Sequence, residues 1–372
     1  MKRFLICFIA VALLLCTVTI SCRAESHLFE EEVRRIENGV GSSAGDQMRA
    51  FGTDSVNDII TNGVDTDSVW MYLLSLLSEY SGGPLTALIL LTAVMMLSSI
   101  AESYSYSLRY TETKDIMGAV VALFVASAVV SPISDMVASS VVIIKGASAI
   151  MTVYLPVMAG IMVFSGHAIS SGGYYAAVTT ASQVISWITS EVLSPLLSVF
   201  LSLSICAGIG SRVHIGGLIE LIGKGFKYVI TFSMSIFIAI IGLNSALTGA
   251  ADSVADKAAR FGLSSFIPII GASVSEAYSA IRGSVTILRS GIGVFVILAI
   301  FVSFAPVLIR VLLWSASISA AKLVGEALSV SSAFAILNAL TAFMSAFRAM
   351  LIAVMTVFLI SSSVMIFVGG QL

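Results

Sequence analysis

The sequence predicts an all-α, polytopic membrane protein, a bundle of about seven to eight transmembrane helices joined to short extracytoplasmic amphipathic helices. Hydrophobic residues make up 58% of the chain and charged residues 11%, whereas soluble domains average about 25% charged residues. The charges also lie outside long apolar stretches, and a bilayer core about 30 Å thick needs roughly 20 mostly apolar helical residues to cross. Charge-free windows are Tyr80–Ala101, Ile116–Ser134, Gly146–Ser190, Val192–Ser211, Tyr228–Ala251, Ser290–Ile309 and Ala349–Leu372.

The N-terminus has the composition of a secretory signal peptide. Lys2 and Arg3 precede the apolar run Phe4–Ile20, and Cys22-Arg23-Ala24 fits a small-x-small cleavage site. An uncleaved anchor is an alternative, because the apolar run is near spanning length, and a lipid-modified Cys22 is a third. In all three cases the segment after the leader is exported, so we expect it outside the cytoplasm.

The exported segment contains two stretches with helical spacing. Leu28, Val33 and Ile36 are spaced as on one face of a short amphipathic helix, which the glycine-rich run 39–43 should end. Val69–Leu77 is amphipathic and aromatic, which suits a helix at the membrane interface leading into the first crossing.

The windows give a predicted organisation of five parts. These are a signal peptide at 1–24, an extracytoplasmic segment at 25–80, six transmembrane helices in 81–247, an amphipathic or re-entrant segment at 248–289, and two transmembrane helices in 290–372.

Two places decide the number of crossings. An outer loop is expected between Pro132 and Lys145. The window Gly146–Ser190 is long enough for two helices, with a break between Gly166 and Gly173, and a very tight outer turn is then required at Glu191–Pro195. If that window is instead one crossing plus a re-entrant piece, everything downstream inverts.

The distribution of basic residues supports one orientation modestly. With eight crossings, eight Lys and Arg residues after the leader fall on the cytoplasmic side, against Lys145, Lys257, Arg260, Arg282, Arg289 and a few in the N-terminal segment outside. This is the bias expected from the positive-inside rule. The C-terminus is then outside.

Signals for catalysis, a metal or a cofactor are missing from the sequence. His27, His167 and His214 form no close pair, and no phosphate-binding glycine loop occurs. Cys206 is the one cysteine after the leader, so no cysteine-based metal site can form. The net charge of −2 predicts no nucleic-acid partner. We therefore expect no enzyme activity, metal or cofactor, and a lipid bilayer as the surroundings.

The segment 248–289 is the best candidate for a functional element. Two amphipathic helical stretches flank the short apolar run Phe266–Gly271, in which Pro268 should break any helix. We single out Phe266, Pro268, Gly271 and Glu276 as candidate functional residues. The pattern fits a re-entrant or interfacial hairpin, or an extracytoplasmic loop with two surface helices.

Charges at the window edges are the other candidates. Glu191, Arg310 and Arg348 lie where a side chain can reach the membrane interface. A charge inside a membrane layer would indicate function. None of the windows contains an acid, which argues against ion-coupled transport.

The block from Phe261 to Ala277, with Phe-Ile-Pro-x-x-Gly followed by Ser-Glu-Ala, resembles stage III sporulation protein AE. The leader, the exported segment and the stretch Gly283–Gly293 extend the resemblance over most of the chain. The resemblance implies a role in endospore formation, in the mother-cell membrane around the engulfed forespore. It also implies a channel- or secretion-like complex whose other members are stage III sporulation A-type proteins, including an ATPase and ring-forming subunits, and a forespore-side partner.

The sequence leaves three functions open. The chain could be a conduit or scaffold subunit of that complex, a self-sufficient secondary permease for a small solute, or a structural anchor with no conduit. An oligomer is possible in each case.

Overall fold

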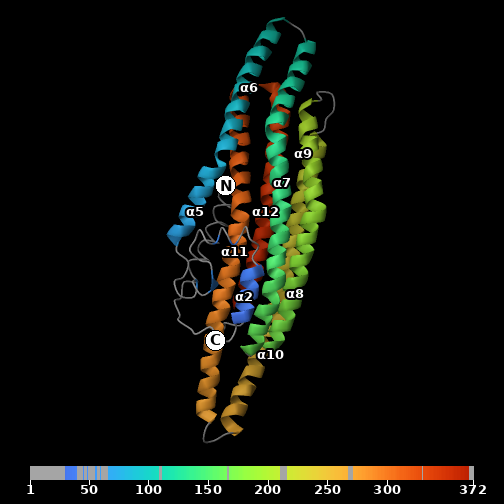
Figure 1. The fold of residues 1–372 in the computed structure, drawn as a ribbon. Coiled ribbons are helices and arrows are strands. Elements are labelled where there is room, and N and C mark those ends of the chain that lie inside the picture. The colour runs from blue at the N-terminus through green and yellow to red at the C-terminus, as the bar shows by residue number, and fades with distance from the viewer. Residues whose placement is uncertain are drawn as a thin grey trace.

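The computed structural model describes residues 30–39, 45, 48, 55, 56, 59, 66–108, 111–165, 167–209, 216–266, 271–328 and 330–367 (Figure 1). In this part of the chain every regular element is a helix, which confirms the predicted fold class. The elements are α2 (Glu30–Gly39), α5 (Thr66–Tyr80), α6 (Gly82–Leu108), α7 (Thr111–Phe164), α8 (Ala168–Trp187), η2 (Ile188–Leu193), α9 (Ser194–Ile209), α10 (Gly216–Phe266), α11 (Gly271–Ala327) and α12 (Ser331–Phe367).

Long helices run up and down one elongated bundle (Figure 1). The 54 residues of α7 extend about 80 Å at about 1.5 Å per residue. Among the described residues, six helices are long and apolar enough to cross a membrane. Three of these candidate spans contain 46, 39 and 43 residues, which is about twice the length that one crossing needs.

The prediction of an outer loop between Pro132 and Lys145 is wrong, because α7 is continuous over these residues. Proline removes one backbone donor and clashes with the carbonyl of residue i−4, which kinks a helix without necessarily ending it. The helix α7 contains two prolines, Pro132 and Pro156. Neighbouring helices packed along its length keep the chain helical on both sides of each.

The tight turn expected at Glu191–Pro195 is also wrong. The chain passes from α8 into α9 through the six-residue π-helix η2. The backbone N–H of Ser194 donates to the carbonyl of Thr189, five residues back, which is the wide π pattern. The Thr189 hydroxyl donates to the Ile185 carbonyl at 2.7 Å. The chain is therefore helical without a turn from Ala168 to Ile209, and the π-helix accommodates one extra residue per turn at its centre.

The break expected near Gly166 is confirmed, and it is short. The chain reverses between Phe164 and Ala168. The Ser165 hydroxyl donates to the Ile161 carbonyl at 2.9 Å, and the Ser171 hydroxyl donates across the hairpin to the Ala159 carbonyl at 2.7 Å. The turns expected at 132–145 and 191–195 are both absent, and the loss of two turns leaves the alternation of helix direction unchanged. The helices α10, α11 and α12 therefore run in the directions that the eight-crossing prediction gave them relative to α6.

The core of the bundle is formed by α11 and α12, which pack against each other more extensively than any other pair. In the most apolar part of Val285–Ala327, 89% of the residues are buried, against 11% in Ile219–Asn244 of α10. The helices α7, α8 and α10 also contact α12. This part of α11 is therefore enclosed by protein, whereas the described part of α10 lies at the periphery.

A buried tyrosine joins two of the core helices. Tyr154 of α7 is fully buried, and its hydroxyl donates to the Ser362 carbonyl of α12 at 3.0 Å. We expect Tyr154→Phe to destabilise the protein by about 1 kcal/mol, because one buried hydrogen bond is lost without loss of the ring. Thermal unfolding of the purified protein in detergent checks this. The matched control Tyr175→Phe removes a hydroxyl from a tyrosine that is 39% exposed, and an equal effect of both variants would contradict the expectation.

The amphipathic helix expected near Leu28–Ile36 is present as α2, which packs on α7. Val33 and Ile36 are buried, and Gly39 lies against Val153. Arg35 and Glu31 form an exposed ion pair at 3.0 Å on the outer face. The helix expected at Val69–Leu77 is part of α5, with Trp70 exposed. The leader lies outside the described residues.

Candidate functional site

Five of the apolar segments lie side by side in one layer of the bundle, here called the lower layer. Interhelical contacts fix their relative heights. Asn244 of α10 donates to the Gly173 carbonyl of α8 at 2.7 Å. Tyr154 of α7 bonds Ser362 of α12, and Gly293 of α11 packs against Ile366 of α12. The lower layer consists of residues 146–164, 168–190, 228–251, 290–309 and 349–367. Each segment is about one bilayer core in length.

The other three apolar segments form a second, upper layer. Ser99 of α6 donates to the Leu328 carbonyl, just after the end of α11, at 3.2 Å. Met95 of α6 lies against Gly325 of α11, and the rings of Phe200 in α9 and Phe343 in α12 are 5.7 Å apart. The upper layer consists of residues 82–101, 116–134 and 192–209, packed on the last parts of α11 and the first part of α12.

Charged side chains gather between the two layers, in what we call the charged belt. Lys145 Nζ lies 3.7 Å from Glu191 Oε1, and the Arg310 guanidinium lies 5.6 Å above the Tyr80 ring. Arg348 Nη1 donates to the Ser315 hydroxyl at 3.4 Å. On α10, Lys224 and Glu220 form an ion pair at 2.7 Å. The belt thus separates two apolar layers, each about as thick as a bilayer core.

The three predicted edge charges all lie in this belt. Glu191 is on η2, Arg310 on α11 and Arg348 on α12. Each interacts with a group from another helix, so the structure brings them to one level of the bundle but not into one contact. Burial and the nearby Glu79 raise the pKa of the Tyr80 hydroxyl, and the charge of Arg310 opposes them. The belt therefore has the composition of a membrane–water boundary.

The Lys145–Glu191 pair allows a small test of the belt. Both side chains are more than half exposed, and exposed ion pairs contribute about 0–1 kcal/mol. We expect Lys145→Glu to lower stability by less than about 1 kcal/mol through repulsion of Glu191. The double variant K145E/E191K should restore it, and a double variant no better than the single one would contradict the pairing. Thermal unfolding in detergent measures both.

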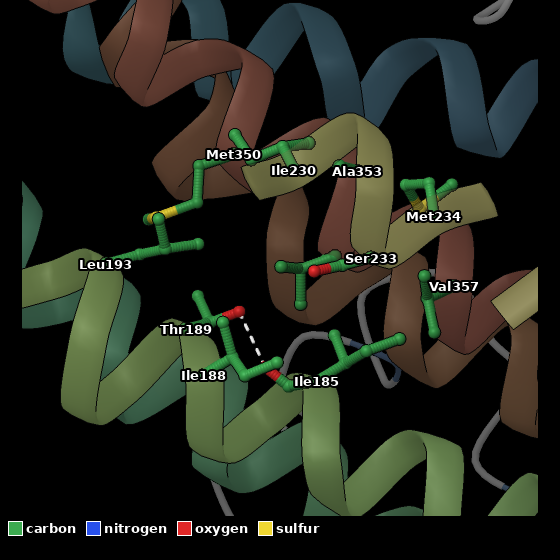
Figure 2. A pocket seen from close by; sticks show the side chains of 11 residues that line it. Ile185, Ile188, Thr189, Leu193, Ile230, Ser233, Met234, Met350, Ala353 and Val357 are labelled. Carbon is green, nitrogen blue, oxygen red and sulfur yellow. Dashed lines mark hydrogen bonds between the residues drawn. The ribbon is translucent and has the colours of Figure 1, made fainter. Parts of the chain in front are cut away.

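A small cavity of about 20 Å³ lies where the belt meets the lower layer (Figure 2). Residues of α8 and η2 face residues of α10 and α12 across it. Figure 2 shows Thr189, Ser233 and Met350 around this space. Leu193 of η2, Ile230 of α10 and Met350 of α12 line this one cavity. These three helices therefore carry their nearby charged residues at about the same level along the bundle. The π-helix thus sits at the junction of the two layers.

The described parts of the segment 248–289 are the last part of α10 and the first part of α11, at the end of the bundle away from α6 (Figure 1). Phe266 is the last residue of α10 and Gly271 the first of α11. Glu276 lies on α11, and Pro268 lies outside the described residues. The predicted order of helix, apolar breaker and helix is confirmed in its two helices. Phe266 and Glu276 lie far along the bundle from the charged belt, so the two groups of candidates do not form one site.

Sequence reasoning missed two buried features where α11 enters the lower layer. Arg289 of α11 is 1% exposed, although it stands just before a charge-free window, where the sequence predicts an external charge. Gly293, one turn further on, allows Ile366 to approach the α11 backbone. The only sign of the buried Arg289 in the sequence was its position at the start of an apolar window. Nothing in the sequence distinguishes Gly293 from the other glycines.

Apolar side chains cover the outer surface of both layers. On α10, Tyr228, Phe232 and Leu243 are each more than 60% exposed. On α6, Ile89 and Ile100 are exposed to a similar degree. Exposed apolar surface of this extent indicates contact with lipid or with another protein. Within the described ranges, no group of three or more His, Cys, Asp and Glu is placed to bind a metal ion.

The apolar layers, the charged belt and the long helices define a helical membrane protein. A family model for stage III sporulation protein AE matches residues 54–369. The chain therefore belongs to the stage III sporulation protein AE family, as the block around Pro268 suggested. No curated protein and no solved structure matched the chain. Membership gives the chain a role in sporulation.

Proposed function

We propose that this protein is a membrane subunit of a channel- or secretion-like complex between mother cell and forespore, and that endospore development requires it. The observation that carries the proposal is family membership across residues 54–369. The partners would be other stage III sporulation A-type proteins, including an ATPase and ring-forming subunits. The site of action would be the mother-cell membrane around the forespore.

The packing of the core favours a scaffold over a conduit through a single copy. Residues 291–302 of α11 are all buried, at the height where a conduit would have to cross the lower layer. Gly293 and Tyr154 lie within this packed region. Any conduit would therefore run between copies or between this subunit and its partners. We assign the protein no catalytic role, and the Ser165 hydroxyl that might suggest one donates to a carbonyl of its own helix.

Deletion of the gene in the native spore-former tests the proposal. We expect engulfment to finish and forespore development to stop afterwards, as seen by membrane staining and microscopy. Expression of the unchanged chain from a second locus should restore spores. Normal forespore development in the deletion strain would contradict the proposal. Uptake of a defined solute by the purified protein alone in liposomes would support a permease in its place.

A further inference from the structure

The helix α2 lies beside the lower layer, at the depth of its apolar segments. It packs on α7, and a β-carbon on Gly39 would lie 3.3 Å from the β-carbon of Val153. Val153 is about 10 Å from the upper end of the segment 146–164, which extends about 28 Å. Figure 1 shows α2 beside the lower half of α7. Asn38 and Arg35, both within about 6 Å of Gly39 along α2, therefore lie beside this apolar segment as well.

The side of α2 that turns away from α7 is polar and charged. Its two apolar side chains, Val33 and Ile36, are buried. The exposed side chains are Glu31, Arg34, Arg35 and Asn38. Glu31 and Arg35 form an ion pair at 3.0 Å, but each side chain remains more than 60% exposed. The five segments of the lower layer contain no Asp, Glu, Lys or Arg, so α2 adds charge to a layer that has none of its own.

A second stretch of the exported segment is held at the same place. The backbone N–H of Val56 donates to Glu37 Oε1 at 3.0 Å. Met48, Val56 and Ile59 are buried in the same hydrophobic core as the helices of the bundle. The charged residues between or next to these three in the sequence are Asp46, Arg49, Asp54 and Asp58. The contact between α2 and α7 is thus reinforced by a stretch that is also rich in charge.

Lipid is a poor neighbour for this side of the lower layer. Charged side chains at membrane depth are costly, and those that occur face protein or a water-filled cavity. Long basic side chains can reach the membrane interface, but the carboxylate of Glu31 is on a short side chain. The burial of Val33 and Ile36 does not offset the transfer of three charged side chains into hydrocarbon. The packing of α2 on α7 therefore requires water on its outer face.

We propose that α2 and the stretch after it face a water-filled passage that runs along the lower layer beside α7. Lipid covers the lower layer on its other sides, where α8 and α10 expose Val184 and Ile240. The passage is the conduit between this subunit and its neighbours in the complex, so the inference rests on the proposed function. It opens to the extracytoplasmic side, where the sequence predicts residues 25–80. Acidic and basic side chains both line it, which suits hydrated solutes.

Ile240 of α10 is the matched position for a test, because it lies at the level of Val153 on another helix. The hydrogen bonds of Ser171 and Asn244 described above align α7, α8 and α10 along the bundle. At about 1.5 Å per residue, Val153 and Ile240 both lie about 9 Å above the level of Ser171. Ile240 is 40% exposed, so a reagent that reaches it meets no protein cover.

Labelling with a membrane-impermeant maleimide tests whether α2 faces water. Asn38→Cys and Ile240→Cys are made separately in the full-length chain with its native cysteines changed to Ser. Membrane fragments from sporulating cells expose both surfaces to the reagent. We expect Asn38→Cys to react at least about ten times faster than Ile240→Cys, because the reactive thiolate forms in water and is suppressed in apolar surroundings. Equal rates, or faster reaction of Ile240→Cys, would overturn the proposal.

An engineered disulfide tests whether α2 lies beside Val153 in the membrane. The β-carbons of the pair G39C/V153C would be 3.3 Å apart, close to the roughly 3.5–4.5 Å of a disulfide. The matched control is G39C/V142C, because Val142 is exposed on the same face of α7 three turns away, at about 16 Å. We expect an oxidant to link G39C/V153C in most molecules and G39C/V142C in few. Equal links in both pairs, or none in G39C/V153C, would overturn the proposal.

The two measurements together separate the passage from its alternatives. A link at G39C/V153C with a protected Asn38→Cys would mean that lipid or a partner protein covers α2, and no passage would exist there. Neither measurement depends on spore formation. Normal forespores in the deletion strain would therefore contradict the proposed function alone, whereas a protected Asn38→Cys in a strain that needs the gene would contradict the passage alone.

Discussion

Phe343→Ala is expected to destabilise the protein by roughly 3–5 kcal/mol, the cost of truncating a buried phenylalanine. Phe343 of α12 is fully buried, and its ring lies 5.7 Å from the Phe200 ring of α9 and 6.0 Å from that of Phe347. The variant would leave a cavity between α9 and α12 and remove both ring contacts. A clear fall in the unfolding temperature in detergent, and less protein in the membrane fraction, would be observed.

Phe334→Ala on the same helix is the matched control. Phe334 is 46% exposed, and Lys322 Nζ lies over its ring, 5.6 Å from the ring centroid. Removal of an exposed cation–π contact should cost about 1 kcal/mol or less. If the two variants lost similar stability, α12 would not be packed against α9 as described.

Gly293→Leu has the second large effect that we expect. A β-carbon on Gly293 would overlap the side chain of Ile366, which is itself buried, and the Tyr154 hydroxyl is close by. Overpacking a dense core costs about 1–3 kcal/mol and sometimes more. The larger leucine must push α11 and α12 apart at their main contact, so we expect a cost at or above the top of that range. The same unfolding measurement in detergent detects it.

Gly242→Leu gives the comparison for this variant. Gly242 lies on α10 in the same layer, and a β-carbon there meets no atom within 4 Å. Leucine in an open, exposed helical position should be neutral or slightly stabilising, because glycine is a poor helix former. Equal losses from both glycine variants would show that α11 and α12 do not approach each other at Gly293.

The composition of the chain was enough to predict the membrane class and most helices. Apolar length alone identifies segments such as 228–251 and 290–309, because the bilayer sets the length of a crossing. The turn after Phe164 was also predictable, since glycine and serine follow it closely. The block around Pro268 identified the family, which the match across residues 54–369 confirms.

Turns inside a helical pattern were less predictable. A proline such as Pro132 or Pro195 either kinks a helix or ends it, and the packing of neighbouring helices decides which. Spacing along the chain also does not show where a residue lies along the axis of the bundle. The belt formed by Lys145, Glu191 and Arg310 could therefore be recognised only from the contacts between helices. The position of Arg289 in the sequence predicts an external charge, whereas its burial comes from the helices around α11.

A belt of exposed charged side chains between two apolar layers is the central feature of this structure, and we expect water at the belt and lipid around the lower layer. Labelling of single cysteines along α8, η2 and α9 with a membrane-impermeant maleimide tests it most directly, in intact membranes of a strain whose chain lacks its native cysteines. Glu191→Cys in the belt should react, since its side chain is 57% exposed. Val184→Cys, about two turns away in the lower layer and 48% exposed, should not react because lipid covers it. Reaction of Val184→Cys with the maleimide would contradict this arrangement of belt and layers, and so would a failure of Glu191→Cys to react.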